Sequence, residues 1–170
     1  MSVIAPGTPA PQFKLARQDG SSFSERDLLG QGTVLVFYPF AFSPVCTEQL
    51  QLYESVLAEL AEDDVRLYGV SCDSTWTQRA FVEGLGVSSE QLSDFEPKGA
   101  ACRAFGVLHP AGFAERALIM TDPGGVVRFS YLAPSPAELP GLEILRAGLS
   151  EAFGLAAGAT RASHAAPAWA

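Results

Sequence analysis

The amino-acid sequence predicts an α/β protein in which helices flank a central mixed sheet and a hairpin lies at the N-terminus. Short runs of β-branched and aromatic residues alternate with segments of helical periodicity, which is typical of this class. Residues 33–85 follow the order strand, helix, strand, helix, which implies parallel strands joined by right-handed crossovers. Later in the chain, two strand-like runs flank the turn sequence DPGG at residues 122–125, which predicts antiparallel pairing. A sheet with both kinds of pairing is mixed.

The first elements are a hairpin and a buried strand. Residues 9–15 and 18–23 are predicted to pair as a short hairpin with its turn at residues 19–20, where Asp-Gly is a strong turn signal. This hairpin leads into residues 25–29. The run at 33–38 is apolar and rich in β-branched and aromatic side chains, as expected for a strand that is buried on both faces.

The remaining elements follow from periodicity and turn signals. Apolar residues recur at spacings of three and four and predict a helix over residues 44–62, at Leu50, Tyr53, Leu57 and Leu60. The later elements are expected to be a strand at 65–70, helices at 75–85 and 99–105, strands at 117–121 and 126–131, and a last helix at 139–153 with Pro140 near its start. This order of elements is that of a thioredoxin-like fold.

Length and composition predict one domain followed by a tail. A chain of 170 residues can bury a substantial core without a stabilising metal or disulfide. The domain is expected to span residues 1–153. From residue 154 to residue 170 the composition shifts to Ala, Gly and small polar residues without a clear period, which predicts a disordered tail.

Charge and the N-terminal sequence exclude several classes of partner and location. The net charge of −8 argues against nucleic acid or an anionic membrane surface as a partner. The N-terminus has neither the basic nor the apolar region of a secretory signal, and no apolar stretch is long enough to cross a bilayer. With only three cysteines, the chain is therefore expected in the reducing cytoplasm.

Cys46 is the strongest candidate for a catalytic residue. The strand at 33–38 is followed by Pro39, and Cys46 lies in the first turn of the helix predicted at 44–62. The N–H groups of a first helical turn have no helical partners, and the positive end of the helix dipole lies there. A thiolate is therefore favoured over a neutral thiol at this position, which makes nucleophilic sulfur chemistry available.

Around this cysteine, Pro39, Ser43 and Cys46 form the pattern P-x-x-x-S-x-x-C. Further along lie SDF-x-P-x-GA at residues 93–100, then AFGV, then GF-x-x-R, which ends at Arg116. With these motifs the chain resembles the peroxiredoxins. It looks most like the AhpE-type one-cysteine group, to which the bacterioferritin comigratory proteins are closely related. The resemblance covers about residues 9–153.

The resemblance implies a thiol peroxidase that reduces hydrogen peroxide and organic hydroperoxides. Cys46 would be the peroxidatic cysteine and would pass through a sulfenic acid, while Ser43 would stand where the family has Thr or Ser. Arg116 would match the active-site arginine, whose permanent charge and planar fork of donors can hold sulfur and peroxide together. Pro39 ends the strand and can shield the sulfur. No metal or organic cofactor is required.

Two residues depart from the family pattern. The family usually has a glutamate three residues after the peroxidatic cysteine, whereas this chain has Gln49 there and Glu48 one place earlier. The pairing of that glutamate with the arginine is therefore in question. Ser43 lacks the methyl group that restricts the rotamers of a threonine, so its hydroxyl is expected to be less well fixed.

The other two cysteines leave the recycling of Cys46 open. The chain has no C-x-x-C pair, which disfavours zinc and dithiol-exchange interpretations. Cys72 and Cys102 are possible resolving cysteines, but a small buried hydrophobe is the commoner role of such a residue. We therefore expect a one-cysteine mechanism with an external thiol or redoxin as reductant, either mycothiol with mycoredoxin or thioredoxin. The resemblance also implies a homodimer.

An alternative function remains on the same fold. Oxidation of Cys46 could regulate a partner interface, which would make the protein a redox sensor or a thiol-regulated binding protein. The aromatic residues Phe40 and Phe42 could form an apolar collar that favours organic hydroperoxides, or a contact between subunits.

Overall fold

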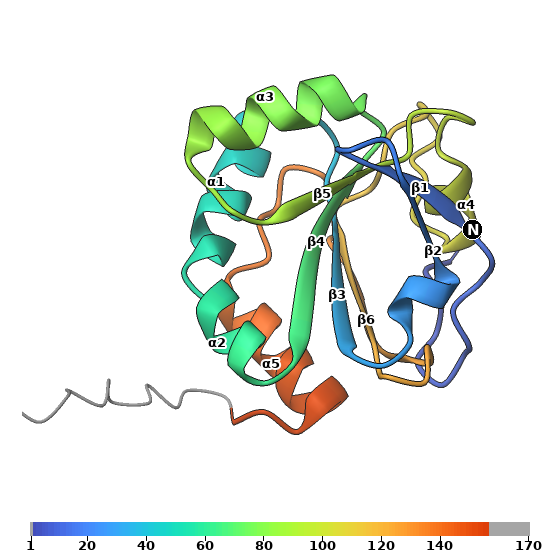
Figure 1. Cartoon of the computed structure of the whole chain (residues 1–170), viewed down its shortest axis with the longest axis vertical. Helices are drawn as coiled ribbons and strands as arrows, with labels where there is room; N and C mark the ends of the chain where they lie inside the picture. The colour runs from blue at the N-terminus through green and yellow to red at the C-terminus, as the bar shows by residue number, and fades with distance from the viewer. Residues whose placement is uncertain (1, 157–170) are drawn as a thin grey trace, which may run out of the picture.

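A mixed sheet forms the centre of the structure, a computed structural model that describes residues 2–156 (Figure 1). The strands are β1 (Lys14–Arg17), β2 (Ser22–Ser24), β3 (Gly32–Phe37), β4 (Val65–Ser71), β5 (Glu90–Ser93), β6 (Ala117–Thr121) and β7 (Val127–Leu132). The helices are a short 3-10 helix, η1 (Glu25–Leu28), and α1 (Pro44–Glu54), α2 (Leu57–Glu62), α3 (Thr75–Leu85), α4 (Ala100–Ala104) and α5 (Leu142–Phe153).

The strand order within the described residues is β2-β1-β5-β4-β3-β6-β7. β3 pairs in parallel with β4, as the alternation of strands and helices predicted. β4 also pairs in parallel with β5. β6 lies antiparallel to both β3 and β7, and the N-terminal hairpin adds β1 antiparallel to β5. The predicted α/β class with a mixed sheet and an N-terminal hairpin is therefore confirmed.

Each face of the sheet supports its own part of the core. Val34 and Val36 of β3 pack with residues of α1, α2 and α5, whereas Leu35 and Phe37 pack with the hairpin and α4. Successive side chains of a strand point to opposite faces, which explains this division. Figure 1 shows α1, α2 and α5 on one side of the strands and α4 on the other. These four side chains of β3 are fully buried, as the sequence predicted.

The helix predicted over residues 44–62 is two helices, α1 and α2, so this prediction was wrong in the middle. The Ser55 hydroxyl donates to the Leu52 carbonyl at 2.7 Å, and the Val56 N–H donates to the Tyr53 carbonyl at 3.1 Å. These contacts close a tighter turn in place of the α-helical ladder. Val56 stays buried in the same apolar cluster as residues of both helices, so the apolar period in the sequence hides the break.

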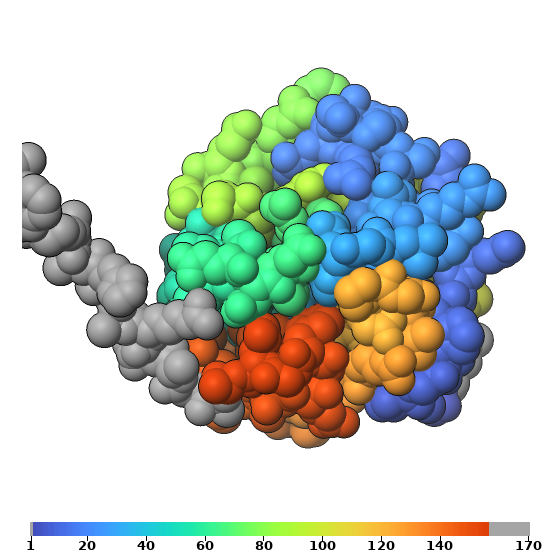
Figure 2. All heavy atoms as spheres, turned by 60° about the horizontal axis from the view of Figure 1, so that its bottom comes forward, coloured from blue at the N-terminus to red at the C-terminus, as the bar shows by residue number. Residues whose placement is uncertain are grey.

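Two other elements differ from the prediction. β5 was not predicted, because its sequence, EQLS, is mostly polar although three of its four residues are buried. α5 begins at Leu142, after Gly141, rather than at residue 139. α5 lies against α2, as Figure 2 shows, and Arg146 and Glu59 join them with an ion pair of 3.2 Å.

The structure tests only part of the predictions about the C-terminal tail and about membrane spans. Most of the tail predicted at 154–170 lies outside the described residues, which end at 156. Leu155, at its beginning, is partly buried against the cluster that contains α5. Within residues 2–156, no helix is both long and apolar enough to span a membrane.

Candidate active site

The junction between β3 and α1 holds Cys46. The Tyr38 N–H donates to the Val70 carbonyl at 3.0 Å and extends the pairing of β3 with β4 by one residue. Pro39, which is buried, then ends the strand. α1 begins at Pro44, a favoured residue for the first helical position, with Ser43 as its N-cap. Cys46 therefore lies in the first turn of α1, as predicted, and its side chain is fully buried.

Arg116 reaches Cys46 from the start of β6. Its Nη2 donates to the Cys46 Sγ at 3.2 Å, its Nη1 donates to Gln49 Oε1 at 2.6 Å, and its Nε donates to the Pro136 carbonyl at 2.8 Å. Only 2 % of the arginine is exposed, so these three contacts fix a guanidinium that water hardly reaches. Two residues that lie 70 positions apart in the chain are thus brought together.

The Arg116 guanidinium takes part in none of the ion pairs within residues 2–156. A buried charge is costly unless an opposite charge or good hydrogen bonds compensate it. Ionised sulfur at Cys46 would supply that opposite charge, so the arrangement favours the thiolate.

Gln49 takes the place of the glutamate that the family usually has. It is fully buried, and its Oε1 accepts from Arg116. Arginine can only donate, so the oxygen of this amide must face the guanidinium. The Gln49 Nε2 then has no hydrogen-bond partner in the described part of the chain. The contact with arginine is kept, but through a neutral acceptor.

Hydrogen bonds shape the loop before α1. The Ser43 hydroxyl donates to the Phe40 carbonyl at 3.0 Å, and the Thr47 N–H donates to the Ser43 carbonyl at 2.9 Å. The Ala41 N–H donates to the Asp73 carboxylate at 2.8 Å, which ties the loop to the end of β4. Sequence reasoning missed this role of Asp73, and also that of Pro136, because neither has a local signal.

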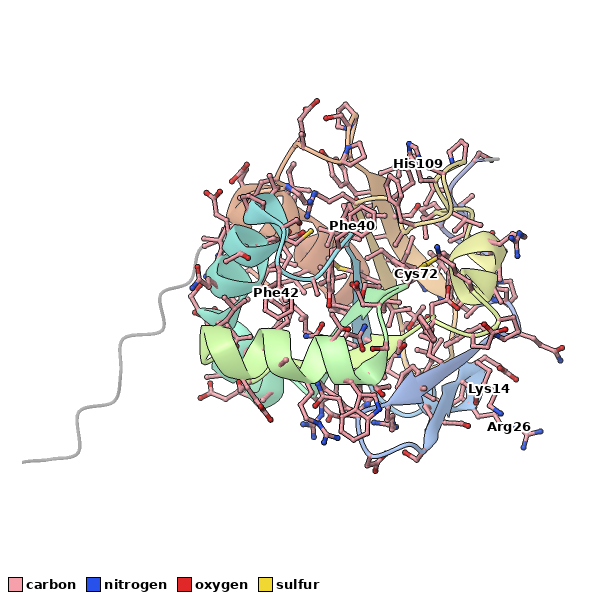
Figure 3. All side chains as sticks on the ribbon, turned by 90° about the horizontal axis from the view of Figure 1, so that it is seen from above. Lys14, Arg26, Phe40, Phe42, Cys72 and His109 are labelled. Carbon is pink, nitrogen blue, oxygen red and sulfur yellow. The ribbon has the colours of Figure 1, made fainter. Side chains whose placement is uncertain are left out.

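Aromatic side chains surround the loop. Phe40 and Phe42 are 47 % and 60 % exposed, and Phe42 has a positive φ of 67°, which is rare for a bulky residue. The Phe42 ring lies 5.1 Å from that of Phe81 on α3, and the Phe40 ring lies 4.7 Å from that of Phe113, which stacks on His109. Figure 3 shows Phe40 and Phe42 on the two sides of this loop. Both rings are exposed on the loop that leads to Cys46, a position that suits an apolar collar or a contact between subunits.

The other two cysteines lie next to each other. The Cys72 Sγ and the Cys102 Sγ are 4.0 Å apart, and all three cysteines are free thiols. Both belong to the cluster with Phe37, whereas Cys46 packs with Tyr38, the next residue along the chain. The alternation of side chains places the pair on the opposite face of the sheet from Cys46. The structure therefore brings Arg116 to Cys46 and brings Cys72 to Cys102.

Comparisons with known proteins identify the family of this chain. Residues 6–130 match the AhpC/TSA family. The chain is 32 % identical over 128 residues to alkyl hydroperoxide reductase E of Mycobacterium tuberculosis. The matched stretch covers 74 % of this chain and 84 % of the relative. It is 35 % identical over 135 residues to alkyl hydroperoxide reductase C of Amphibacillus xylanus, which covers 75 % of this chain and 71 % of the relative.

Solved structures agree with the fold. The crystal structure of Enterococcus faecalis AhpC superposes with a TM-score of 0.76 at 28 % identity, over 86 % of this chain and 92 % of that one. Peroxidoxin BcpB from Mycobacterium tuberculosis superposes with a TM-score of 0.73 at 25 % identity, over 87 % and 96 % of the two chains. The resemblance to the AhpE-type group and its bacterioferritin comigratory relatives is confirmed, and the chain belongs to the AhpC/TSA family.

Proposed function

We propose that this chain is a thiol peroxidase that reduces hydrogen peroxide and organic hydroperoxides through a sulfenic acid on Cys46. The observation that supports this most is the contact of 3.2 Å between Arg116 Nη2 and Cys46 Sγ at a site that is almost completely buried. A fixed cation beside a thiol in the first turn of a helix stabilises the thiolate, which is the nucleophilic form.

The chemical step is a displacement on oxygen. The Cys46 thiolate attacks one peroxide oxygen, an S–O bond forms as the O–O bond breaks, and the leaving oxygen takes a proton to become water or an alcohol. Negative charge moves from sulfur to the leaving oxygen, and Arg116 stays within reach of both, so it stabilises the transition state more than the ground state.

Ser43 and Pro39 complete the proposed site. Ser43 is the N-cap residue of α1, and its hydroxyl, which donates to the Phe40 carbonyl in this structure, can turn to donate to a peroxide oxygen. Pro39 is buried in the loop that approaches the sulfur and has no N–H of its own. Its part is to limit the access of water to the thiolate.

An external thiol returns Cys46 to its reduced form. Cys72 and Cys102 pack in a different cluster, on the other face of the sheet, which favours a one-cysteine cycle. The sulfenic acid then reacts with a low-molecular-weight thiol to give a mixed disulfide and water, and a second thiol or a redoxin resolves it. Mycothiol with mycoredoxin is our candidate pair, with thioredoxin as the alternative, in a reducing cytoplasm.

The exposed aromatic residues support a homodimer. Phe40 and Phe42 leave large apolar surfaces in water beside the active-site loop. A second copy of the chain that covers them would place the subunit contact next to the active-site loop.

Peroxide consumption with a thiol reductant tests the proposal. The wild type, Cys46→Ser and the matched control Cys72→Ser would be compared at equal concentrations with hydrogen peroxide and with an organic hydroperoxide. We expect the wild type and Cys72→Ser to turn over alike, and Cys46→Ser to lose the rapid turnover of the wild type. Loss of turnover in Cys72→Ser would instead assign recycling to that cysteine, and turnover in Cys46→Ser at the wild-type rate would refute the proposed nucleophile.

A further inference from the structure

A second group of reactive side chains lies on the opposite face of the sheet from Cys46. Cys72 directly follows β4, Cys102 lies in α4, and Asp94 directly follows β5. One sulfur or oxygen atom from each lies within 4.8 Å of the others, and all three residues are buried. Figure 3 shows Cys72 beside α4. The proposed peroxidase cycle uses none of these three residues.

Backbone contacts hold the group in place. The Asp94 carboxylate accepts from the N–H groups of Ala101 and Cys102 at 3.1 and 2.8 Å, and the Asp94 N–H donates to the Ser71 carbonyl at 2.8 Å. Asp94 therefore connects the end of β4, which precedes Cys72, to α4, which holds Cys102. The closeness of the two sulfurs is a product of this network and of the sheet, not of two flexible loops.

The distance between the sulfurs is a contact distance. The two Sγ atoms are 4.0 Å apart and share a hydrogen bond, whereas a disulfide bond is about 2 Å long. Closing the remaining gap of about 2 Å requires adjustment of side-chain rotamers and of the short α4 segment. The two thiols are therefore adjacent, reduced and not yet bonded.

The two thiols differ in acidity. The hydrogen bond from Cys102 lowers the pKa of Cys72, whereas burial and the Asp94 carboxylate raise it and nearby Lys98 lowers it a little. The pKa of Cys102 is raised because its proton is held in the bond to Cys72, and burial and the Asp94 carboxylate add to this. Cys72 is thus the nucleophile of the pair, and Cys102 keeps its proton.

The exposed fractions of the two cysteines also indicate that Cys72 reacts before Cys102. Cys72 is 7 % exposed and Cys102 is fully buried. A molecule as small as hydrogen peroxide meets Cys72 first, and Cys102 can then react only with its neighbour. Burial raises the pKa of Asp94, so its carboxylate is a stronger base than an exposed one and can accept the Cys102 proton.

We propose that Cys72 and Cys102 form a second redox centre, a dithiol that peroxide converts to an intramolecular disulfide independently of Cys46. The Cys72 thiol first releases its proton to solvent. The resulting thiolate attacks hydrogen peroxide, so that an S–O bond forms, the O–O bond breaks, and the departing hydroxide takes up an equivalent proton from solvent to become water. Cys102 then attacks the Cys72 sulfenic sulfur, an S–S bond forms, and the S–O bond breaks. The second hydroxide takes the Cys102 proton, which passes through Asp94. Two thiols are oxidised by two electrons, and one peroxide becomes two waters.

The test uses the full chain with Cys46→Ser, so that failure of this proposal is separate from failure of the peroxidase proposal. Reduced Cys46→Ser is treated with an excess of hydrogen peroxide, blocked with N-ethylmaleimide and analysed by intact mass and by peptide mapping without reductant. We expect a monomer that has lost about 2 Da and takes up no maleimide, with the Cys72 and Cys102 peptides linked. Reductant should restore both thiols.

The matched control is Cys46→Ser with Cys102→Ser, in which Cys72 should gain oxygen and form no internal link. The proposal is overturned if Cys46→Ser keeps two maleimide-reactive thiols in excess peroxide, since the pair would then be two buried thiols without redox function. It is equally overturned if the products are over-oxidised cysteines or links between two chains.

Discussion

Arg116 Nη2 donates a hydrogen bond of 3.2 Å to the Cys46 sulfur, while Nη1 of the same guanidinium donates one of 2.6 Å to the neutral amide oxygen of Gln49. Among the groups that accept a hydrogen bond from this guanidinium within residues 2–156, the Cys46 sulfur is the one that can become an anion. A glutamate at residue 49 would share the positive charge. The reactivity of Cys46 should depend on both neighbours, in ways that substitutions can separate.

Replacing Arg116 removes the cation. Arg116→Met should lower the second-order rate constant for Cys46 oxidation by about 10²–10³-fold, the usual effect of losing a donor to charge that develops in a transition state. Stopped-flow fluorescence would measure the rate, and circular dichroism would check the fold. Exposed Arg66→Met is the matched control. A loss of less than about threefold in Arg116→Met would contradict the account.

Gln49→Glu tests the sharing of charge. A carboxylate makes a stronger, charge-assisted hydrogen bond to Arg116, but it adds negative charge next to the sulfur. We expect Gln49→Glu to slow Cys46 oxidation at neutral pH by about tenfold, because the added negative charge competes with the sulfur for Arg116. Stopped-flow rates would show this, with Glu48→Gln as the control on the exposed neighbour. An unchanged or higher rate would mean that Gln49 does not act through Arg116.

Ser43 offers a pair of opposite substitutions. Its hydroxyl is the donor proposed for the peroxide, so Ser43→Ala should slow Cys46 oxidation about tenfold, the equivalent of one hydrogen bond. Ser43→Thr keeps the hydroxyl and restricts its rotamers, so the rate should be retained or rise. Equal rates in the two variants would remove Ser43 from the mechanism.

Tyr53→Phe tests how α1 is held against the segment that leads to α5. The buried Tyr53 hydroxyl donates to the Pro140 carbonyl at 2.7 Å. Its loss should lower the free energy of unfolding by about 1 kcal/mol, because a buried carbonyl is left without its donor. Urea denaturation would measure the difference against half-buried Tyr131→Phe, which should change stability less.

The acidity of Cys72 depends on Cys102 and can be read from alkylation. The hydrogen bond from Cys102 is the largest cause that lowers the Cys72 pKa, and burial opposes it. Removing the donor leaves burial, so the Cys72 pKa should move upward in Cys102→Ala. In a Cys46→Ser background, the pH midpoint of Cys72 alkylation by iodoacetamide should therefore rise. A midpoint that stays in place would mean that the thiols do not interact.

The fold was predictable where the chain gives a local signal. The alternation of apolar strands with helical periods fixed the order of elements from β3 to α3, and Ser74 and Gly86 cap α3 at the predicted ends. β5 was missed because two of its three buried residues, Gln91 and Ser93, are polar. The Gln91 side chain accepts from the Tyr38 hydroxyl and donates to Ser89, so its burial depends on partners that no local pattern reveals.

The site was predictable to a similar degree. Cys46 follows from a strand-to-helix junction, whereas Arg116 was found through the family motif, since an arginine before a strand is by itself ordinary. The contact of Cys72 with Cys102 depends on how β4 and α4 pack, and the sequence spacing of 30 residues gives no sign of it. Sequence reasoning could not predict which side chains from distant parts of the chain come into contact.

The most direct test of the central claim is the rate at which reduced protein reacts with hydrogen peroxide, followed by intact mass. Stopped-flow measurement on the wild type should show a rapid phase that Cys46→Ser lacks, and the wild-type product should carry one added oxygen that a small thiol removes. If the wild type reacts no faster than an ordinary free thiol, Cys46 is not a peroxidatic cysteine, and a redox-regulated binding role on this fold becomes the better explanation.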